Sequence, residues 1–466
     1  MQRRELLAWG LGAWAMGPRA WANPAHLHLK MPPLLDTTRS GRAKLTIEAG
    51  EVDFWRRGQM SATKGFNGAY LGPTLRMRAG EVAMSIHNQS REATTVHWHG
   101  MLIPGSVDGG PHQMIEPGAL WSPVLPVAQA PATLWYHAHP HGRTARDVYA
   151  GLAGVIHIVD DQDEARGLPH HYGEDDLTLV LQDRLFDAHG RMVYDDSMPS
   201  RMHGFHGDVV MVNGQIGARA QVPKGLTRLR LVNGSNARVY PLAFVDGRAM
   251  HLIATDGGHL PQPVALQRLL LAPGQRAEVL VDFADGQDAL LRAAPDPNAG
   301  PMGGGGALDV LAFVVDHDKR ARMPRVPQDL GGQAPALKVP TRVDRVLSLD
   351  MGMRMGPGAF AINGAPFDMA TINQRVSLGR VERWRITADM MWHPFHVHGV
   401  LFQVLSLGDQ APPAQYAGWH DTVLVAGSAE IAMRFTQSAS EQHPFMYHCH
   451  ILEHEDGGMM GQFTVV

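Results

Sequence analysis

The sequence predicts an all-β protein built from three Greek-key β-sandwiches. Short strand patterns recur along the 466 residues with few helical patterns between them, and 51 Gly and 32 Pro supply abundant turn formers. A chain of this length exceeds one ordinary core, so two to four domains are expected. Polar or Pro-rich joints divide it into three blocks, which favours one sandwich per block.

The chain begins with a segment typical of export. Arg3 and Arg4 precede an uncharged apolar run over residues 6–16, and the small residues that end at Ala22 fit a cleavage site. Residues 1–22 are therefore interpreted as an export signal, either an ordinary secretory one or a twin-arginine one. The protein is expected to be periplasmic or otherwise exported. No later stretch is long and apolar enough to predict a membrane span.

Three domains and a linker follow the signal. The predicted domains cover residues 23–165, 166–318 and 341–466, and a Pro-, Arg- and Gly-rich linker covers residues 319–340. Strand patterns support these blocks, at residues 44–48 in the first and at 177–181, 209–212, 228–232 and 278–281 in the second. Asn213-Gly214 and Asn233-Gly234 follow two of these runs and predict turns.

Bulk composition excludes some classes of partner. The formal net charge of −4 indicates no excess of basic residues, so nucleic acid is not an expected partner. Charged residues make up 18% and apolar residues 44%, as in a soluble globular protein, and a monomer is expected. The lone Cys449 excludes an intramolecular disulfide, and its starting interpretation is a small inert core residue.

Four histidine clusters stand apart among the 26 histidines. Imidazole is a preferred ligand of copper, zinc, iron and nickel. One His-x-His pair is weak evidence, because two histidines often meet by chance. Four pairs, two in each terminal block, predict a metal site shared between those blocks. The clusters are His97-Trp98-His99, His137-Ala138-His139, His393-Pro394-Phe395-His396-Val397-His398, and His448-Cys449-His450 with His454.

Strand geometry divides these residues into two sets. Side chains two residues apart in a strand lie on the same face, so each pair directs both rings the same way. Eight imidazoles suit a cluster of several metal ions. Cys449 lies between His448 and His450 and must face away from that cluster. His393 lies an odd number of residues before His396 and is expected to face away as well.

The residues that face away predict a second metal site. Cys449 and His393 are joined by His454 and Met459 from the following loop. Two His, one Cys and a weak axial Met form the ligand set of a blue copper electron-transfer site. Cys449 is also bonded through the backbone to two histidines of the first cluster, which gives an electron a short route between the sites. Zinc does no redox chemistry, so copper is the predicted metal.

These motifs resemble those of the multicopper oxidases, the family of laccases, ascorbate oxidase, bilirubin oxidase and bacterial copper efflux oxidases. The resemblance implies three cupredoxin domains and four copper ions: one type 1, one type 2 and two type 3. It makes His393, Cys449, His454 and Met459 the type 1 ligands. His97 and His396 would hold the type 2 copper. The type 3 ligands would be His99, His137, His139, His398, His448 and His450.

The amino-acid sequences of several loops are most similar to those of the bacterial copper efflux oxidases. These loops are Gly68–Thr74, Val107–Pro111 and His454–Met460. In such enzymes a substrate gives single electrons to type 1 copper, and four electrons reduce dioxygen to water. Asp108 and Glu455 match acidic positions that assist proton delivery. The alternative for Asp108 is an ordinary turn residue in Val-Asp-Gly-Gly.

Methionines offer a site for a cuprous substrate. Met351, Met353 and Met355 alternate before a Gly-rich segment, and Asp389 and Met391 precede the third cluster. Thioethers are soft ligands that suit Cu(I), although Met is more often a core filler. The long Met- and His-rich insertion of some efflux oxidases is absent, which leaves better access for small phenols.

Several functions remain open. The leading hypothesis is an exported cuprous oxidase with laccase-like activity that acts in copper detoxification. A general laccase or bilirubin-type oxidase is the second hypothesis. A non-catalytic copper-sequestering or cell-division protein is the third, although such relatives lose copper ligands that this chain keeps. Copper-nitrite reductase is disfavoured, because it has two domains and does not need four His-x-His pairs.

Overall fold

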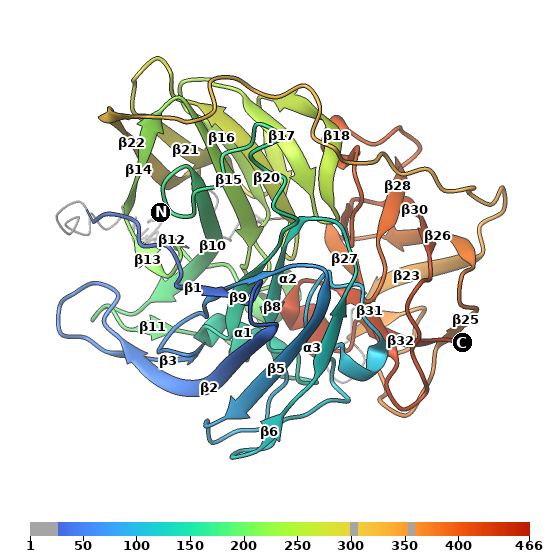
Figure 1. Cartoon of the computed structure of the whole chain (residues 1–466). Helices are drawn as coiled ribbons and strands as arrows, with labels where there is room; N and C mark the ends of the chain where they lie inside the picture. Colours follow the sequence, from blue (N-terminus) through green and yellow to red (C-terminus); the bar gives the residue numbers. More distant parts are fainter. Residues whose placement is uncertain (1–26, 299–305, 353–358) are drawn as a thin grey trace, which may run out of the picture.

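The computed structural model describes residues 27–298, 306–352 and 359–466. These residues form strands connected by loops, with three short α-helices, so the all-β prediction is confirmed (Figure 1). The predicted export signal, Met353 and Met355 lie outside the described residues. No helix among the described residues is both long and apolar enough to cross a bilayer.

Two sheets face each other in the N-terminal part of the chain. One has the strand order β1-β4-β9-β8, and the other has the order β3-β2-β5-β6 with β7 also paired to β5. Along β5 the apolar side chains of Val82, Met84 and Ile86 alternate inward and meet Leu75 and Ile156 of the facing sheet. The strands are β1 (Leu34–Asp36), β2 (Arg42–Val52), β3 (Ser61–Phe66), β4 (Thr74–Met77), β5 (Gly80–Asn88), β6 (Leu120–Trp121), β7 (Val124–Val127), β8 (Ala132–His137) and β9 (Ala153–Ile158).

A larger pair of sheets follows. The orders are β13-β12-β10-β15-β20-β17-β18, with β11 paired to β10, and β14-β22-β21-β16-β19. The strands are β10 (Asp176–Phe186), β11 (Met192–Val193), β12 (Val209–Val212), β13 (Gln215–Ile216), β14 (Arg219–Lys224), β15 (Leu226–Asn233), β16 (Tyr240–Phe244), β17 (Met250–Thr255), β18 (Gly258–Leu266), β19 (Leu269–Leu271), β20 (Arg276–Asp282), β21 (Ala289–Ala293) and β22 (Leu308–Arg320).

The two predicted Asn-Gly turns differ. Asn213 and Gly214 both have positive φ, 52° and 71°, and join β12 to β13 as a tight hairpin, as predicted. Asn233-Gly234 does not form a hairpin but begins the loop between β15 and β16, where Oδ1 of Asn233 accepts from the backbone N–H of Ser235 at 3.0 Å. Asn233 ends β15, and its side-chain amide donates to the carbonyls of Arg238 and Leu271 at 2.8 and 2.9 Å. These bonds hold a longer loop in place of a hairpin.

The C-terminal part also has two five-stranded sheets. Their orders are β24-β23-β26-β30-β28 and β25-β32-β31-β27-β29. The strands are β23 (Arg345–Met351), β24 (Phe360–Ile362), β25 (Gln374–Val376), β26 (Val381–Ala388), β27 (His393–Val397), β28 (Phe402–Leu407), β29 (Thr422–Val425), β30 (Ser428–Arg434), β31 (Phe445–Cys449) and β32 (Met460–Val465).

Each of the three parts contributes one short helix near the centre of the molecule, and α3 contacts the other two (Figure 1). The helices are α1 (Thr144–Ala150), α2 (Met198–His203) and α3 (Leu452–Asp456). The Asp456 carboxylate of α3 accepts hydrogen bonds from the backbone N–H groups of Thr144 and Ala145, at 2.8 and 2.9 Å. Those groups begin α1 and have no partner inside the helix, so Asp456 caps it. This bond fixes the N-terminal part against the C-terminal part beside the histidine clusters.

Candidate metal centre

Eight histidine rings from the N-terminal and C-terminal parts converge at one buried place. His97 stacks on His398 with 3.8 Å between ring centroids, and His99 stacks on His396 with 3.7 Å. Each of these stacks joins a ring of the N-terminal part to a ring of the C-terminal part. All eight side chains are almost completely shielded from solvent.

The backbone orients half of these rings. In four of them Nδ1 donates to a main-chain carbonyl, which leaves the lone pair of Nε2 free on the other side of the ring. The donors are His97, His137, His396 and His448, and the acceptors are the carbonyls of Asp108, Ala138, Asp421 and Cys449 at 3.0, 2.9, 2.8 and 2.9 Å respectively.

Several of the remaining ring nitrogens are buried without a protein partner. Among the described residues, Nε2 of His97, His137 and His396 and both nitrogens of His450 have none. A buried nitrogen lone pair without a donor is costly unless a cation binds it. The donor set therefore fits metal ions.

Two trios can be distinguished within the cluster. Nε2 of His448 lies 3.3 Å from Nε2 of His139 and 3.3 Å from Nε2 of His398. In the other trio the rings of His99, His137 and His450 are separated by 5.1–5.6 Å between centroids. Burial lowers the pKa of each of these six rings well below its ordinary value, so the imidazoles are neutral and can bind cations.

Cys449 lies at a second, smaller site. Its Sγ is 3.3 Å from Nδ1 of His393 and 3.8 Å from Nδ1 of His454, and these two nitrogens are 3.4 Å apart. Nε2 of His454 donates to the carbonyl of Met202 at 3.1 Å, so its Nδ1 lone pair faces the sulfur. The triangle fits one soft cation. Met459 is buried, and its carbonyl accepts from the backbone N–H of Cys449 at 3.1 Å.

Burial raises the pKa of the Cys449 thiol well above its ordinary value. A coordinated cation reverses this effect, because it stabilises the thiolate directly. The backbone N–H of Ile451 donates to Sγ at 3.3 Å and provides further stabilisation of negative charge on sulfur.

The two sites lie on opposite faces of the same strand ends. His396 of β27 pairs with His448 of β31, and Phe395 pairs with Cys449. The four His-x-His pairs themselves extend past regular strands. His97 makes only an isolated bridge to His137, and His99 already lies in a turn.

The two acidic residues predicted to assist proton delivery contact histidines of the eight-ring cluster. Asp108 Oδ2 accepts from His398 Nδ1 at 2.8 Å and lies 3.4 Å from His97 Nδ1. Glu455 spans His139 and His448, with oxygen-to-Nδ1 distances of 3.3 and 3.2 Å. Burial raises the pKa of Glu455 well above its ordinary value. Asp108 also ends the short turn Gly105–Val107, so it is a turn residue as well.

Sequence reasoning missed a third carboxylate, Asp421. Its Oδ1 lies 3.2 Å from His99 Nε2, and its Oδ2 forms an ion pair of 2.6 Å with Nη2 of Arg276. This ion pair holds the pKa of Asp421 well below its ordinary value. Asp421 stands in Trp-His-Asp-Thr, where no metal-binding spacing marks it, and Arg276 comes from a part of the chain without a histidine cluster.

Comparison with known proteins agrees with this geometry. Residues 48–163, 166–297 and 338–466 each match a family description that reads multicopper oxidase. The chain belongs to the multicopper oxidase family. Membership implies copper as the metal of the two sites.

Relatives of this chain have different names. The laccase-like multicopper oxidase CueO from the lignin-degrading bacterium Ochrobactrum sp. is 41% identical, with a TM-score of 0.88 over 94% of this chain and 100% of that one. McoA multicopper oxidase from Aquifex aeolicus is 30% identical, with a TM-score of 0.84 over 95% and 100%. Cell division protein FtsP from Dickeya dadantii is 37% identical over 459 residues, 97% of this chain and 96% of that protein.

A cavity of about 610 Å³ adjoins the cysteine site. Met202 and Phe360 line it, and Phe360 also stacks on His454 with 4.5 Å between centroids. His454 itself is fully shielded. Of the predicted cuprous-substrate residues, Met351 and Met391 are half-buried and pack on the C-terminal core, and Asp389 is exposed. The structure thus describes three of these five residues.

Proposed function

We propose that this chain is an exported four-copper oxidase, which acts as a monomer and couples one-electron oxidation of Cu(I) or small phenols to the reduction of dioxygen to water. The triangle of His393, Cys449 and His454 carries the proposal. A buried thiol between two imidazoles suits a redox-active copper, and the neighbours of Cys449 in the chain belong to the histidine cluster.

The proposed copper ligands follow from the two sites. His393, Cys449, His454 and Met459 hold type 1 copper. His97 and His396 hold type 2 copper. The type 3 pair is held by His99, His137, His139, His398, His448 and His450. When bound, the copper ions supply one-electron redox chemistry and dioxygen reduction.

The polypeptide contributes the connection between the sites. Cys449 is bonded through the backbone to His448 and His450, so no through-space gap separates the mononuclear site from the cluster. Burial of both sites excludes bulk water, and the carbonyls that orient the rings hold the free nitrogens in fixed positions. Such preorganisation keeps reorganisation small during electron transfer.

Asp108 and Glu455 are proposed to hold and transfer the protons that dioxygen reduction consumes. Glu455 reaches two ligand-type histidines from α3. Asp108 Oδ1 is buried and has no hydrogen-bond partner among the described residues, so it is available to a water molecule. A carboxylate in contact with a metal-binding imidazole both orients the ring and relays protons.

The substrate is the second part of the proposal. Met351, Met353, Met355, Asp389 and Met391 would bind Cu(I) at the entrance to the cysteine site. The cavity beside His454, at about 610 Å³, has room for a small phenol. Both uses are compatible with a role in copper detoxification.

A non-catalytic role in cell division is the second candidate. It is favoured by the relative named Cell division protein FtsP, which is similar over nearly the whole chain. The buried, unpartnered histidine nitrogens favour the oxidase, because a protein without copper gains nothing from them.

Oxygen uptake by the copper-loaded chain distinguishes the candidates. Cu(I), a phenol and bilirubin are supplied as separate reductants, and copper per chain is measured in parallel. The oxidase predicts uptake with Cu(I) or the phenol and four coppers per chain. Absence of uptake with every reductant would overturn it and favour the cell-division role. A triple change of Met351, Met353 and Met355 to Ser should lower Cu(I) turnover while Met114→Ser, an exposed control, should not.

A further inference from the structure

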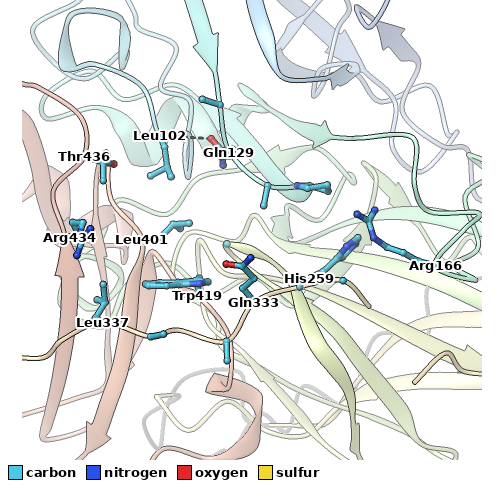
Figure 2. A pocket seen from close by; sticks show the side chains of 18 residues that line it. Leu102, Gln129, Arg166, His259, Gln333, Leu337, Leu401, Trp419, Arg434 and Thr436 are labelled. Carbon is cyan, nitrogen blue, oxygen red and sulfur yellow. Dashed lines mark hydrogen bonds between the residues drawn. The ribbon is translucent and has the colours of Figure 1, made fainter. Parts of the chain in front are cut away.

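A second cavity is lined by residues from all three parts of the chain, and none of the lining residues belongs to the cysteine site (Figure 2). Its volume is about 640 Å³, which is within the range of small-molecule sites. Leu102 and Gln129 come from the N-terminal part, His259 from the middle part, and Trp419 and Arg434 from the C-terminal part. Residues 331–337, within the predicted linker, close one side.

Trp419 is held rigidly in the wall. Its carbonyl accepts hydrogen bonds from the N–H of Gly257 at 2.9 Å and from Oγ1 of Thr255 at 2.8 Å. Gly257 lines the cavity too, and a Cβ at this position would collide with the Trp419 side chain. The backbone at Trp419 is therefore fixed and the base of its half-buried side chain packs on Gly257, which limits movement of the indole and the entropic cost of binding a ring against it.

The charges in the wall have one sign. No acidic side chain lines the cavity among the described residues, although the whole chain carries a net charge of −4. Arg166 is already neutralised by a two-bond pair with Asp160, at 2.7 and 2.6 Å. Arg434 is exposed, and its guanidinium has no hydrogen-bond or ion-pair partner in the described part of the chain. Among the described residues that line the cavity, Arg434 is the cation without a partner.

His259 adds a buried donor. Nη2 of Arg228 donates to its Nε2 at 3.0 Å, so in the neutral ring the proton is on Nδ1. The side chain is nine-tenths buried and lines the cavity. In Figure 2 the labelled side chains run from Arg434 and Thr436 past Trp419 to His259, so polar groups stand at both ends of an apolar middle.

We propose that this cavity binds a small aromatic anion, with its ring against Trp419 and its negative group at Arg434. Leu337 and Leu401 complete the apolar middle of the site. The aromatic part gains from burial against the indole, and the anion gains a charge-assisted hydrogen bond from the guanidinium. This site is separate from the proposed oxidase chemistry and does not require a reducible or oxidisable ligand.

The cavity beside His454 differs in a way that separates the two sites. Asp196, Glu453 and Asp456 line it together with two arginines, and Asp196 already pairs with both Arg146 and Arg201. An anion is therefore expected to prefer the cavity at Arg434.

Calorimetric titration of the copper-loaded chain with 2-naphthoate tests the proposal. We expect one saturable site. Arg434→Gln should weaken binding by about tenfold or more, because a charge-assisted hydrogen bond is worth roughly 1.5–3 kcal/mol. Uncharged 2-naphthamide should bind the parent protein about tenfold or more weakly than 2-naphthoate does, for the same reason. Trp419→Leu should also weaken binding.

Two controls locate the site. Arg268→Gln removes another exposed arginine that has no partner among the described residues, and it should leave affinity unchanged. Arg146→Gln alters the cavity beside His454 and should also leave it unchanged. The proposal is overturned if naphthoate does not saturate, if Arg434→Gln binds it like the parent, or if the neutral amide binds equally well. Oxygen uptake, measured on the same variants, reports on the oxidase separately.

Discussion

Arg276 and Asp421 form an ion pair of 2.6 Å in which both side chains are completely buried. Arg276 begins β20 in the middle part of the chain, and Asp421 immediately precedes β29 in the C-terminal part. The other carboxylate oxygen of Asp421 contacts His99 of the N-terminal part at 3.2 Å. The middle part, which contributes no proposed copper ligand, is thus linked to the histidine cluster through this arginine and its aspartate partner.

Replacement of Asp421 by Asn is expected to lower the free energy of unfolding by about 3–5 kcal/mol, because it leaves a buried guanidinium without a counter-charge. Copper bound by the histidine cluster should decrease, since His99 and His396 lose the carboxylate that contacts them. The visible absorption of the cysteine site should persist. Urea denaturation and copper per chain measure these effects.

The matched control for Asp421 is Asp309→Asn. Asp309 pairs with Arg292 at 2.6 Å, but both side chains are exposed, so solvent replaces the lost bond. The variant should match the parent in stability and copper content. Equal stability of Asp421→Asn and Asp309→Asn would contradict the structural role of the buried pair.

Replacement of Cys449 by Ser should abolish visible absorption and oxygen uptake, because a hydroxyl is a poor ligand for a soft redox copper. Copper per chain should decrease by one, since His448 and His450 are retained. His141→Gln is the control, because His141 is exposed, packs edge-to-face on Phe367 with 5.1 Å between centroids, and is not a proposed ligand. Oxygen uptake by Cys449→Ser with any reductant would show that electrons enter elsewhere.

Replacement of Glu455 by Gln should slow oxygen uptake about 100-fold, as expected for loss of a proton-transfer group. The amide has the same shape, so copper content and visible absorption should not change. Glu441→Gln removes an exposed carboxylate that pairs with Arg375, and it should leave the rate unchanged. A normal rate in Glu455→Gln would assign proton delivery to other groups.

Strand parity is the reason that much of the site could be predicted from the sequence. Cys449 and His448 are adjacent, and adjacent side chains in a strand point to opposite faces whatever the rest of the fold. The contact between Arg276 and Asp421 could not be predicted in this way, because it joins positions 145 residues apart and needs three packed parts of the chain. The cavity lined by Trp419 and Arg434 could not be predicted for the same reason.

Local geometry also limited what parity could predict. His97-Trp98-His99 does not form a regular strand, yet the two rings reach the same cluster, 5.8 Å apart between centroids. Asn233-Gly234 has the composition of a hairpin turn, but tertiary hydrogen bonds to Asn233 outweigh that preference. Residue composition therefore predicts a turn less reliably than strand alternation predicts the direction of a side chain. The reason is that a polar side chain such as Asn233 can bond to carbonyls elsewhere in the fold.

Stability below neutral pH should depend on His259. Burial beside Arg228 lowers its pKa to about 4 from the ordinary 6.5. Between these values the unfolded chain binds a proton that the folded chain does not, so stability decreases as the pH falls. From pH 7 to pH 5 this histidine should account for a loss of about 2 kcal/mol. In urea denaturation, the loss of stability between pH 7 and pH 5 should be smaller in His259→Gln than in the parent by about 2 kcal/mol. His189→Gln, which alters an exposed ring, should lose as much stability as the parent. Identical pH dependence in the parent and His259→Gln would mean that the buried ring accepts a proton in the folded protein.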